Sequence, residues 1–156
     1  MASQRKEIVY FAGAIRGDRV AADSMIEIVS FIKSLGFPVL TEHVGTADPI
    51  ATFAGKIGKT KENLTAEDIE EQDIKWLDQA THVIAEISGG STGTGREIEY
   101  ARMKGRMGKT PADVLCVYQR NREFFASPMI RGMRREKYPN VSIQSYGDMG
   151  EMKQLV

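Results

Sequence analysis

Short apolar runs alternate with longer amphipathic segments along the chain. Runs of this kind, rich in Val, Ile and Leu and bounded by polar or turn-forming residues, are typical of strands buried on both faces of a parallel sheet. The sequence contains five of them: IVYFA from Ile8, FPVLTEHV from Phe37, HVIAEI from His82, DVLCVY from Asp113 and NVSIQSY from Asn140. Because segments with helical periodicity separate the runs, we expect an α/β fold in which helices cover both faces of a five-stranded parallel sheet.

The segments between the runs differ in how clearly they predict helices. Apolar residues recur at helical spacing over 20–35, and Gly36 provides a stop. The clearest start is TAED, in which Thr65 precedes an acid at capping-box spacing, and the helical pattern then continues to about Ala80. Residues 46–65 have no clean period, and we expect a long surface loop or short irregular helices there. Shorter helices are expected over 95–107, 129–135 and 149–156.

The composition limits the classes of function that the chain can have. Its 156 residues suffice for a full hydrophobic core, and we expect a single domain over 1–156. Twenty-one Lys and Arg balance 21 Asp and Glu, so no excess charge attracts nucleic acid or an anionic membrane. The single cysteine, Cys116, cannot form a disulfide within the chain and is expected to be buried. Since the N-terminal residues also lack an apolar stretch for a signal peptide, the cytosol or the nucleus is favoured.

Common nucleotide and metal motifs are absent from the sequence. Phe53 and Met103 stand where the P-loop pattern requires glycine ahead of the two GKT segments. The loop GGSTGTG does not match the dinucleotide fingerprint and follows the third apolar run rather than the first. His43 and His82 lie in expected strands without metal-ligand spacing. We therefore expect neither a metal nor an organic cofactor, and structural roles for both histidines.

The segment ISGGSTGTGREIEYA, which begins at Ile87, is the strongest candidate for a ligand site. Glycines let backbone N–H groups approach an anion, and the N-terminus of the following helix favours negative charge. Ser91, Thr92 and Thr94 add hydroxyl donors. In a parallel α/β sheet, ligands bind at the carboxyl ends of the strands, so this loop should share one cleft with the loops after the first and fourth runs. A flexible turn is the alternative, but the position between a strand and a helix favours an anion-binding loop.

Carboxylates close to this loop are candidates for chemistry. We expect Glu97 in the first turn of the helix, where the dipole lowers its pKa and keeps it ionised. An ionised carboxylate beside an anion suits nucleophilic attack or stabilisation of an oxocarbenium ion, and a helix-end acid without a chemical role is the alternative. Glu99 points about 200° away from it and is expected at the surface. Asp73 lies in a helix interior, which Asp disfavours, although taken alone it would be read as a solvated side chain.

Together, these motifs resemble a known family. The chain is similar to the nucleoside 2-deoxyribosyltransferase superfamily, and most of all to its branch of 2'-deoxynucleoside 5'-monophosphate N-glycosidases. The resemblance implies a flavodoxin-like, or Rossmann-like, three-layer fold and a homodimer. It also implies cleavage of the N-glycosidic bond, which releases a free base and 2-deoxyribose 5-phosphate. The matching motifs, from about residue 8 to residue 132, are VYFAGAIRG, LTEHV, EQDIKWLDQATHVIAEIS, STGTGREIEYA and SPMIRG.

The resemblance implies catalytic roles for residues in three of these motifs. Glu97 matches the nucleophile, which forms a covalent glycosyl-enzyme intermediate. Asp73 matches the carboxylate that assists proton transfer near the sugar and the base. Tyr10 matches the tyrosine of the first strand that orients the nucleophile. A pair of carboxylates without a metal agrees with the known chemistry of glycoside cleavage.

The implied phosphate site draws on several loops. Ser91 and the amide of Gly93 match phosphate donors, and Ser127, with Met129 in its Ser-x-Met context, matches a serine donated by the neighbouring subunit. Members of this branch carry serine where this chain has Ala14, and we expect Arg16 to compensate for the lost hydroxyl. The other implied contacts come from the loop after the first run: Gly13, Ile15, Arg16 and Gly17.

The sequence therefore favours hydrolysis of nucleoside 5'-monophosphates at the N-glycosidic bond. In the transferase branch, which uses unphosphorylated nucleosides, we expect Asp in place of Ser91 and Asn in place of Ser127, and a carboxylate there would repel phosphate. Two alternatives stay open: a transferase that exchanges bases on free deoxynucleosides, and a non-catalytic nucleotide-binding protein. The preferred base and the preference for deoxyribose over ribose are also open.

Overall fold

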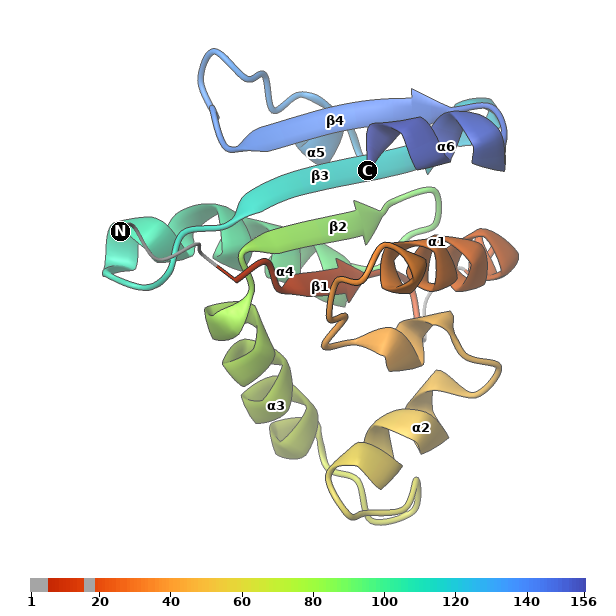
Figure 1. The fold of residues 1–156 in the computed structure, drawn as a ribbon, viewed down its shortest axis with the longest axis vertical. Helices are drawn as coiled ribbons and strands as arrows, with labels where there is room; N and C mark the ends of the chain where they lie inside the picture. Colours follow the sequence, from red (N-terminus) through yellow and green to blue (C-terminus); the bar gives the residue numbers. More distant parts are fainter. Residues whose placement is uncertain (1–5, 16–18) are drawn as a thin grey trace.

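Four parallel strands form the sheet at the centre of the computed structural model, which describes residues 6–15 and 19–156 (Figure 1). Their order across the sheet follows the chain: β1 (Val9–Ala12), β2 (His82–Glu86), β3 (Asp113–Gln119) and β4 (Val141–Tyr146). The α/β class and the parallel pairing of the strands are confirmed.

The expected strand at 37–44 is wrong, so the sheet has four strands rather than five. A single bridge joins this segment to β1, between Val39 and Val9. The chain then turns into a 3-10 helix, η1 (Glu42–Gly45). The bridge nevertheless places the segment beside β1, on the side away from β2.

Pairing stops after the bridge because other groups take up the hydrogen bonds of β1. Pro38 has no N–H to extend a ladder on its side of the bridge. On the other side, the Thr41 hydroxyl accepts from the N–H of Phe11 and donates to the Phe11 carbonyl, each at 2.7 Å. The buried Thr41 side chain thus takes the two backbone hydrogen bonds of Phe11 that a continued strand would have made.

Helices cover both faces of the sheet (Figure 1). Successive residues of β1 serve opposite faces, as the pleat requires: Phe11 packs in one hydrophobic cluster and Tyr10 in the other. The face of Tyr10 is therefore the one that meets the helices directly before and after β2 in the chain. On the Phe11 side lie α1 (Ala22–Ser34) and α6 (Met149–Leu155), and on the Tyr10 side lie α3 (Ala66–Gln79), α4 (Thr92–Met103) and α5 (Pro128–Arg131).

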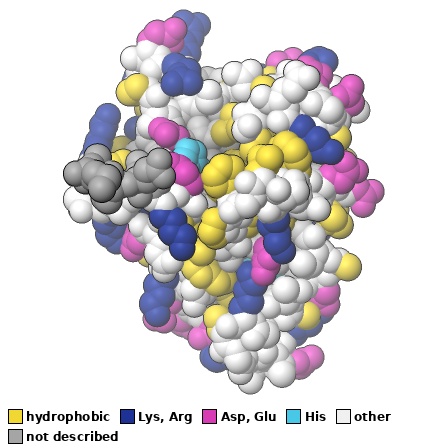
Figure 2. Space-filling view, in the orientation of Figure 1, with side chains coloured by type: hydrophobic (Ala, Val, Ile, Leu, Met, Phe, Trp, Pro, Cys, Tyr) yellow, Lys and Arg dark blue, Asp and Glu magenta, His cyan; other side chains and the backbone are white. Residues whose placement is uncertain are grey.

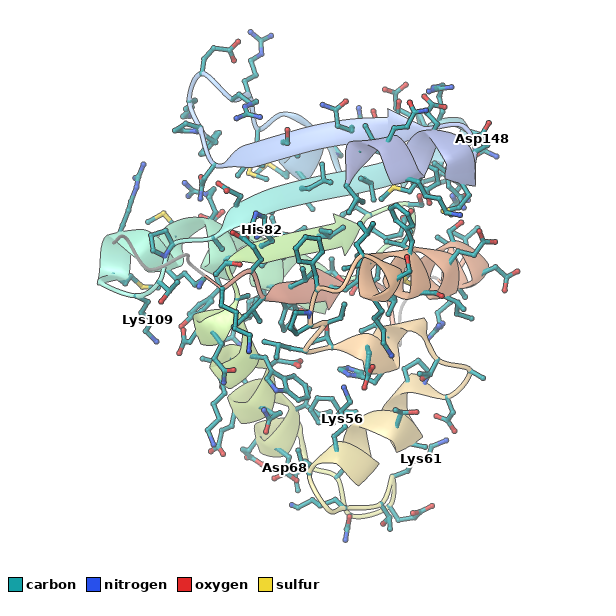
Figure 3. The ribbon with its side chains drawn as sticks, in the orientation of Figure 1. Lys56, Lys61, Asp68, His82, Lys109 and Asp148 are labelled. Atoms are coloured by element: carbon teal, nitrogen blue, oxygen red, sulfur yellow. The ribbon has the colours of Figure 1, made fainter. Side chains whose placement is uncertain are left out.

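Two helices between η1 and β2 extend beyond the edge of the sheet (Figure 1). The segment expected to be a loop or short irregular helices contains α2 (Pro49–Lys56). The next helix, α3, begins with the capping box predicted at Thr65, whose side chain accepts from Asp68 N–H at 3.1 Å. Lys56 is the last residue of α2, and its side chain reaches toward α3, where the ammonium lies 5.3 Å from the centre of the Trp76 ring (Figure 3). The helix α2 is therefore held against α3.

Short 3-10 helices complete the fold after α4 and after β3: η2 (Lys104–Met107) and η3 (Arg120–Arg122). Acidic and basic side chains are interspersed over the face seen in Figure 2, in agreement with the net charge of zero. Among residues 6–15 and 19–156, no helix combines the length and the apolar character needed to cross a membrane.

Candidate active site

A cavity of about 590 Å³ opens at the carboxyl ends of β1 and β2. Parallel α/β sheets bind their ligands at this end. A second cavity of about 550 Å³ lies at the amino ends of the strands, and its walls contain none of the predicted site residues. The first cavity is therefore the candidate site, and its lining comprises Gly13, Ile15, His43, Pro49, Ile50, Phe53, Leu64, Ile69, Asp73, Gly90, Ser91, Thr92, Gly93 and Glu97.

Tyr10, Asp73 and Glu97 come together at this cavity from three separate elements. Tyr10 projects from β1 toward α3 and α4, and its hydroxyl donates a hydrogen bond to a carboxylate oxygen of Glu97. Asp73 on α3 and Glu97 on α4 line the same cavity. Both carboxyls act on the hydroxyl of Tyr10, whose pKa burial and these two charges raise well above its usual value. The phenol thus stays protonated as a donor to the carboxylate pair.

Burial controls the protonation of the two carboxyls. It raises the pKa of Glu97 to about 8; the hydrogen bond from Tyr10 opposes this shift, and the charge of Asp73 adds to it. Burial also raises the pKa of Asp73 to about 6, where the hydrogen bond with Tyr10 opposes the shift and the charge of Glu70 adds to it. Between these two values the pair holds a single proton, which belongs to the pair as a unit.

The expectation that the helix dipole keeps Glu97 ionised is wrong. The helix α4 begins at Thr92 with Ser91 as its N-cap, which places Glu97 in the second turn rather than the first. The dipole acts mainly within the first turn, whereas burial disfavours the charged form anywhere along a helix. Burial therefore wins, and in the free protein Glu97 holds its proton more tightly than a surface glutamate.

One oxygen of the carboxylate pair has no protein partner. Within the described residues, the buried Oδ1 atom of Asp73 accepts no hydrogen bond and donates none. Buried polar atoms in folded proteins usually have a partner. Because Asp73 lines the cavity, this oxygen is available to a ligand group or to a transferred proton.

The first turn of α4 forms the polar end of the cavity. The Ser91 oxygen accepts hydrogen bonds from the amide of Thr94 at 3.2 Å and from its hydroxyl at 3.0 Å. Both bonds use Ser91 as an acceptor, so its own hydroxyl hydrogen is left to donate to a ligand. The amides of Thr92 and Gly93 have no intrahelical acceptor at this end of a helix, and both residues line the cavity. These donors suit an anion.

This polar end lies directly beside the carboxylates. A methyl group added to Gly93 would stand 3.9 Å from Oε1 of Glu97. An anion held by the first turn of α4 would therefore lie close to Glu97.

His43 is a cavity residue that the sequence did not reveal as one. It is 2% exposed, and its ring packs between Phe53 and Trp76 at centroid distances of 5.0 and 5.7 Å. Burial, together with the charge of Lys56, lowers its pKa to about 3, so the imidazole is neutral. Its buried Nδ1 has no partner among the described residues. The LTEHV segment had been expected to be a strand, which hid the position of His43 at the site.

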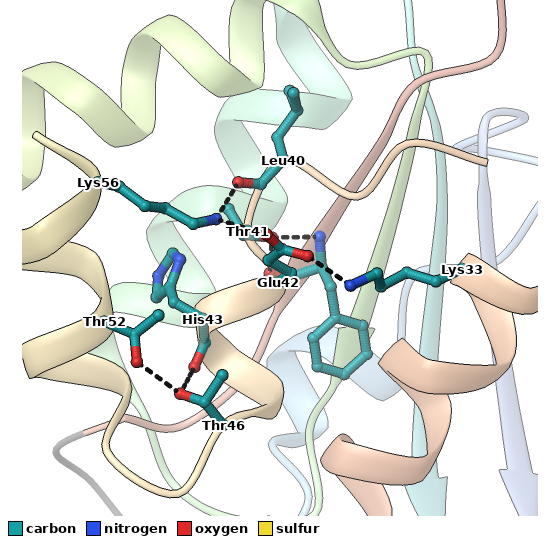
Figure 4. A network of polar contacts seen from close by, with 9 residues as sticks. Lys33, Leu40, Thr41, Glu42, His43, Thr46, Thr52 and Lys56 are labelled. Carbon is teal, nitrogen blue, oxygen red and sulfur yellow. Dashed lines mark hydrogen bonds and ion pairs between the residues drawn. The ribbon is translucent and has the colours of Figure 1, made fainter. Parts of the chain in front are cut away.

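A polar network fixes η1 and α2 around this histidine (Figure 4). Lys56 donates to the Leu40 carbonyl at 3.1 Å and lies 3.8 Å from Glu42, which also pairs with Lys33 at 2.7 Å. The Thr46 hydroxyl donates to the His43 carbonyl at 2.6 Å. The 46–65 segment, whose role the sequence left open, therefore provides an anchored apolar wall of the cavity.

The remaining predicted site residues fall into three groups. Gly13 and Ile15 line the cavity, as the sequence suggested. Arg16 and Gly17 lie outside the described residues. Ser127 and Met129 do not line the cavity of their own chain; Ser127 is the N-cap residue of α5.

Two further sequence expectations concern side chains outside this cavity. Glu99 pairs with Arg102 at the surface, with 56% of its side chain exposed, as expected. Cys116 is buried, also as expected, and burial raises the pKa of its thiol to about 12. Among residues 6–15 and 19–156, no cluster of three or more His, Cys, Asp or Glu side chains is arranged to hold a metal.

The relation of the chain to known proteins agrees with this arrangement. The family model for nucleoside 2-deoxyribosyltransferase matches residues 9–151. The chain belongs to the nucleoside 2-deoxyribosyltransferase family. A 5-hydroxymethyl-dUMP N-hydrolase of Tetraodon nigroviridis is 36% identical over 126 residues, which are 80% of this chain and 78% of the relative. A human protein of the same description is also 36% identical over 126 residues, 80% of this chain and 64% of the relative.

A solved structure of a member of the N-glycosidases has a similar fold. The CMP N-glycosidase BcmB of Clostridium botulinum superposes with a TM-score of 0.61 and 18% sequence identity, over 96% of each chain. At this level of identity the likeness concerns the fold. It supports the arrangement of strands and helices in this nucleoside 2-deoxyribosyltransferase family member.

Proposed function

We propose that the protein hydrolyses the N-glycosidic bond of nucleoside 5'-monophosphates and releases a free base and a sugar 5-phosphate. One observation carries this proposal: a helix N-terminus suited to an anion lies next to two carboxyls that line the same cavity and whose pKa values burial raises. The homologous N-hydrolases named above act on a nucleoside monophosphate, 5-hydroxymethyl-dUMP. Membership of the nucleoside 2-deoxyribosyltransferase family supports chemistry at the glycosidic carbon.

The reaction divides into two steps at the sugar carbon C1'. In the first, a carboxylate oxygen of Glu97 forms a bond to C1' while the bond from C1' to the base nitrogen breaks, and the base takes a proton from Asp73. In the second, water attacks C1' and frees Glu97, and the water proton returns to Asp73. The protein ends as it began, and this is the double displacement of retaining glycosidases.

Tyr10 supplies the proton arrangement that this reaction requires. In the free protein between these pKa values, the single proton of the pair rests mainly on Glu97, whose pKa of about 8 exceeds the value of about 6 for Asp73. Attack needs the proton on Asp73 instead. The Tyr10 hydroxyl donates to Glu97 and interacts with Asp73, so it can relay the proton and then hold the ionised Glu97.

The polar end of the cavity supports a substrate that carries a phosphate. Ser91, Thr92 and Gly93 offer a hydroxyl and two amides, without a carboxylate in this turn. Remote contacts of this kind can orient the reacting carbon above the nucleophile. The neutral ring of His43 and the apolar wall of α2 would then face the base.

A homodimer would complete this phosphate site with Ser127 from a neighbouring copy. The supporting observation is the unusual exposure around Ser127: Phe124 is 89% exposed and Met129 85%. Large apolar side chains this exposed often mark an interface. Mixing two inactive variants, Glu97→Ala and Ser127→Tyr, tests the arrangement, since shared sites would restore activity in mixed dimers and self-contained sites would not.

The test of the proposed activity is a substrate panel. Deoxy- and ribonucleoside 5'-monophosphates and the matching nucleosides are incubated with the protein, with and without an added acceptor base, and free and exchanged bases are separated by chromatography. We expect base release from monophosphates, reduced more than about 1,000-fold in Glu97→Ala. Base exchange on free nucleosides would instead indicate the transferase activity, and binding without any turnover a nucleotide-binding protein.

A further inference from the structure

Glu86 is a buried carboxylic acid that the proposed reaction does not use. It ends β2, is 2% exposed, and points to the face of the sheet opposite the catalytic pair, toward Tyr146 of β4. Burial raises its pKa, while hydrogen bonds from Tyr146 and Ser88 oppose the shift. A buried carboxyl costs stability compared with an apolar side chain of similar size. The hydrogen bonds of Glu86 indicate why the chain keeps a carboxyl at this position.

The two oxygens of Glu86 hold the start of the loop that leads to α4. Oε1 accepts a hydrogen bond from the backbone N–H of Ser88 at 2.5 Å, and Oε2 accepts one from the hydroxyl of Tyr146. The side chain of the last strand residue thus folds back on the amide two positions later. The chain therefore leaves the sheet in a fixed direction.

Ser88 extends this network to the end of β3 and to α1. Its oxygen accepts from the N–H of Gln119 at 2.7 Å, and the Gln119 side chain donates to the hydroxyl of Ser24 at 3.1 Å. Ser24 is the third residue of α1. The network consequently ties the start of the loop that leads to α4 to the end of β3 and to the first turn of α1.

The loop between this network and α4 consists of glycines. Gly90, for example, is exposed, and a methyl group added there would meet no atom within 4 Å. Nothing along Gly89 and Gly90 can therefore fix the position of Ser91 by side-chain packing. That position is set from two sides, by the network around Ser88 and by the cap of α4.

We infer that Glu86, with Tyr146, is a positioning residue that holds the loop over 87–91 so that Ser91 and the first amides of α4 meet the substrate phosphate. This inference rests on the proposed function for the identity of the ligand. It assigns Glu86 to the phosphate end of the site alone. A displacement of the loop by about 1 Å is enough to weaken such contacts severely, whereas the apolar wall at α2 does not depend on it.

The test compares two ligands that differ only in the phosphate. Calorimetry measures the Kd of a 2'-deoxynucleoside 5'-monophosphate and of the same nucleoside, with all proteins carrying Glu97→Gln to prevent turnover. The parent, Glu86→Gln and Tyr146→Phe are compared, and Glu99→Gln is the control because it removes a similar charge from the surface. Thermal unfolding verifies that each variant is folded, and base release by the wild type is measured separately.

We expect Glu86→Gln and Tyr146→Phe to raise the Kd of the monophosphate about 10-fold, or about 1.4 kcal/mol, and that of the nucleoside less than about 2-fold. The control should change neither. Equal effects on both ligands, or none, would overturn the inference, and so would a parent that binds both ligands equally. If Glu86→Gln does not fold, Tyr146→Phe decides alone. Selective phosphate binding without base release by the wild type would refute the proposed function and leave the positioning role intact.

Discussion

Replacing Glu97 with glutamine should make the protein more stable at alkaline pH while it abolishes the reaction. The folded state raises the pKa of this carboxyl from 4.5 to about 8. A raised pKa means that the folded state gains from the bound proton at low pH. That gain is complete below about pH 4.5 and is lost as the pH rises through about 8. Glutamine has no proton to lose and escapes this loss.

The size of the effect follows from the same shift. From 4.5 to about 8, at about 1.4 kcal/mol for each pKa unit, the upper bound is roughly 5 kcal/mol. Because Glu97 lines an open cavity, entry of water reduces this value. We expect a gain of about 1–3 kcal/mol at about pH 8.5, a rise in Tm of about 2–10 °C, and less than about 1 kcal/mol at about pH 5.

Thermal and urea unfolding at these two pH values test the reasoning. Glu99→Gln is the matched control, because Glu99 pairs with Arg102 at the surface and its pKa is lowered. This variant should lose a few tenths of a kcal/mol or remain unchanged. A Glu97→Gln variant that is destabilised at about pH 8.5, or equally stabilised at both pH values, would show that burial does not hold the proton on Glu97.

Three further predictions concern the reaction. The pH–rate profile should rise near 6 and fall near 8, because only the singly protonated pair contains both a nucleophile and an acid. Asp73→Asn should remove the fall at alkaline pH, because no acid is left to lose its proton, and His43→Gln should leave both limbs, since His43 is neutral down to about 3. Tyr10→Phe should lower kcat about 100-fold and move the alkaline limb to higher pH, because the hydrogen bond from Tyr10 lowers the pKa of Glu97 and its loss raises that pKa. Ser91→Asp should keep the helix cap and the Tm but raise KM for monophosphates at least about 10-fold, whereas Ser91→Ala should cost about 1 kcal/mol of stability.

Local signals in the sequence predicted the elements that position the site. Thr65 and Asp68 form the expected capping box and start α3, which carries Asp73. Ser91 caps α4 at the end of the glycine-rich loop, although the helix starts earlier than the expected Gly95. Both features depend on residues close together in the chain, where spacing and helix chemistry suffice.

The errors came from tertiary contacts that spacing does not encode. The run that contains Val39 is as apolar as a strand, but Thr41 takes the hydrogen bonds that a strand would need. The pKa of Glu97 depends on burial against Tyr10 and Asp73, which lie on other elements. The position of His43 at the cavity depends on α2, in a segment without clear helical period.

The proposed site also explains why the chain keeps buried carboxyls at all. Asp73 has a buried oxygen without a partner in the described part of the chain, and Glu97 is forced to hold its proton. Burying such carboxyls lowers the stability of the fold, and the rest of the structure must offset this loss. Groups with perturbed pKa values of this kind cluster at active sites. The stabilisation expected in Glu97→Gln is the measurable form of that cost.

The central claim is that Glu97 attacks the sugar carbon of a nucleoside 5'-monophosphate. The most direct measurement is a rapid acid quench of the protein with the best substrate of the panel, followed by peptide mass spectrometry, with base release by Glu97→Gln measured in parallel. The account predicts the mass of a sugar phosphate on the peptide at Glu97 and a variant that releases base more than about 1,000-fold more slowly. Base release by Glu97→Gln at the wild-type rate, or an adduct on another residue, would contradict it.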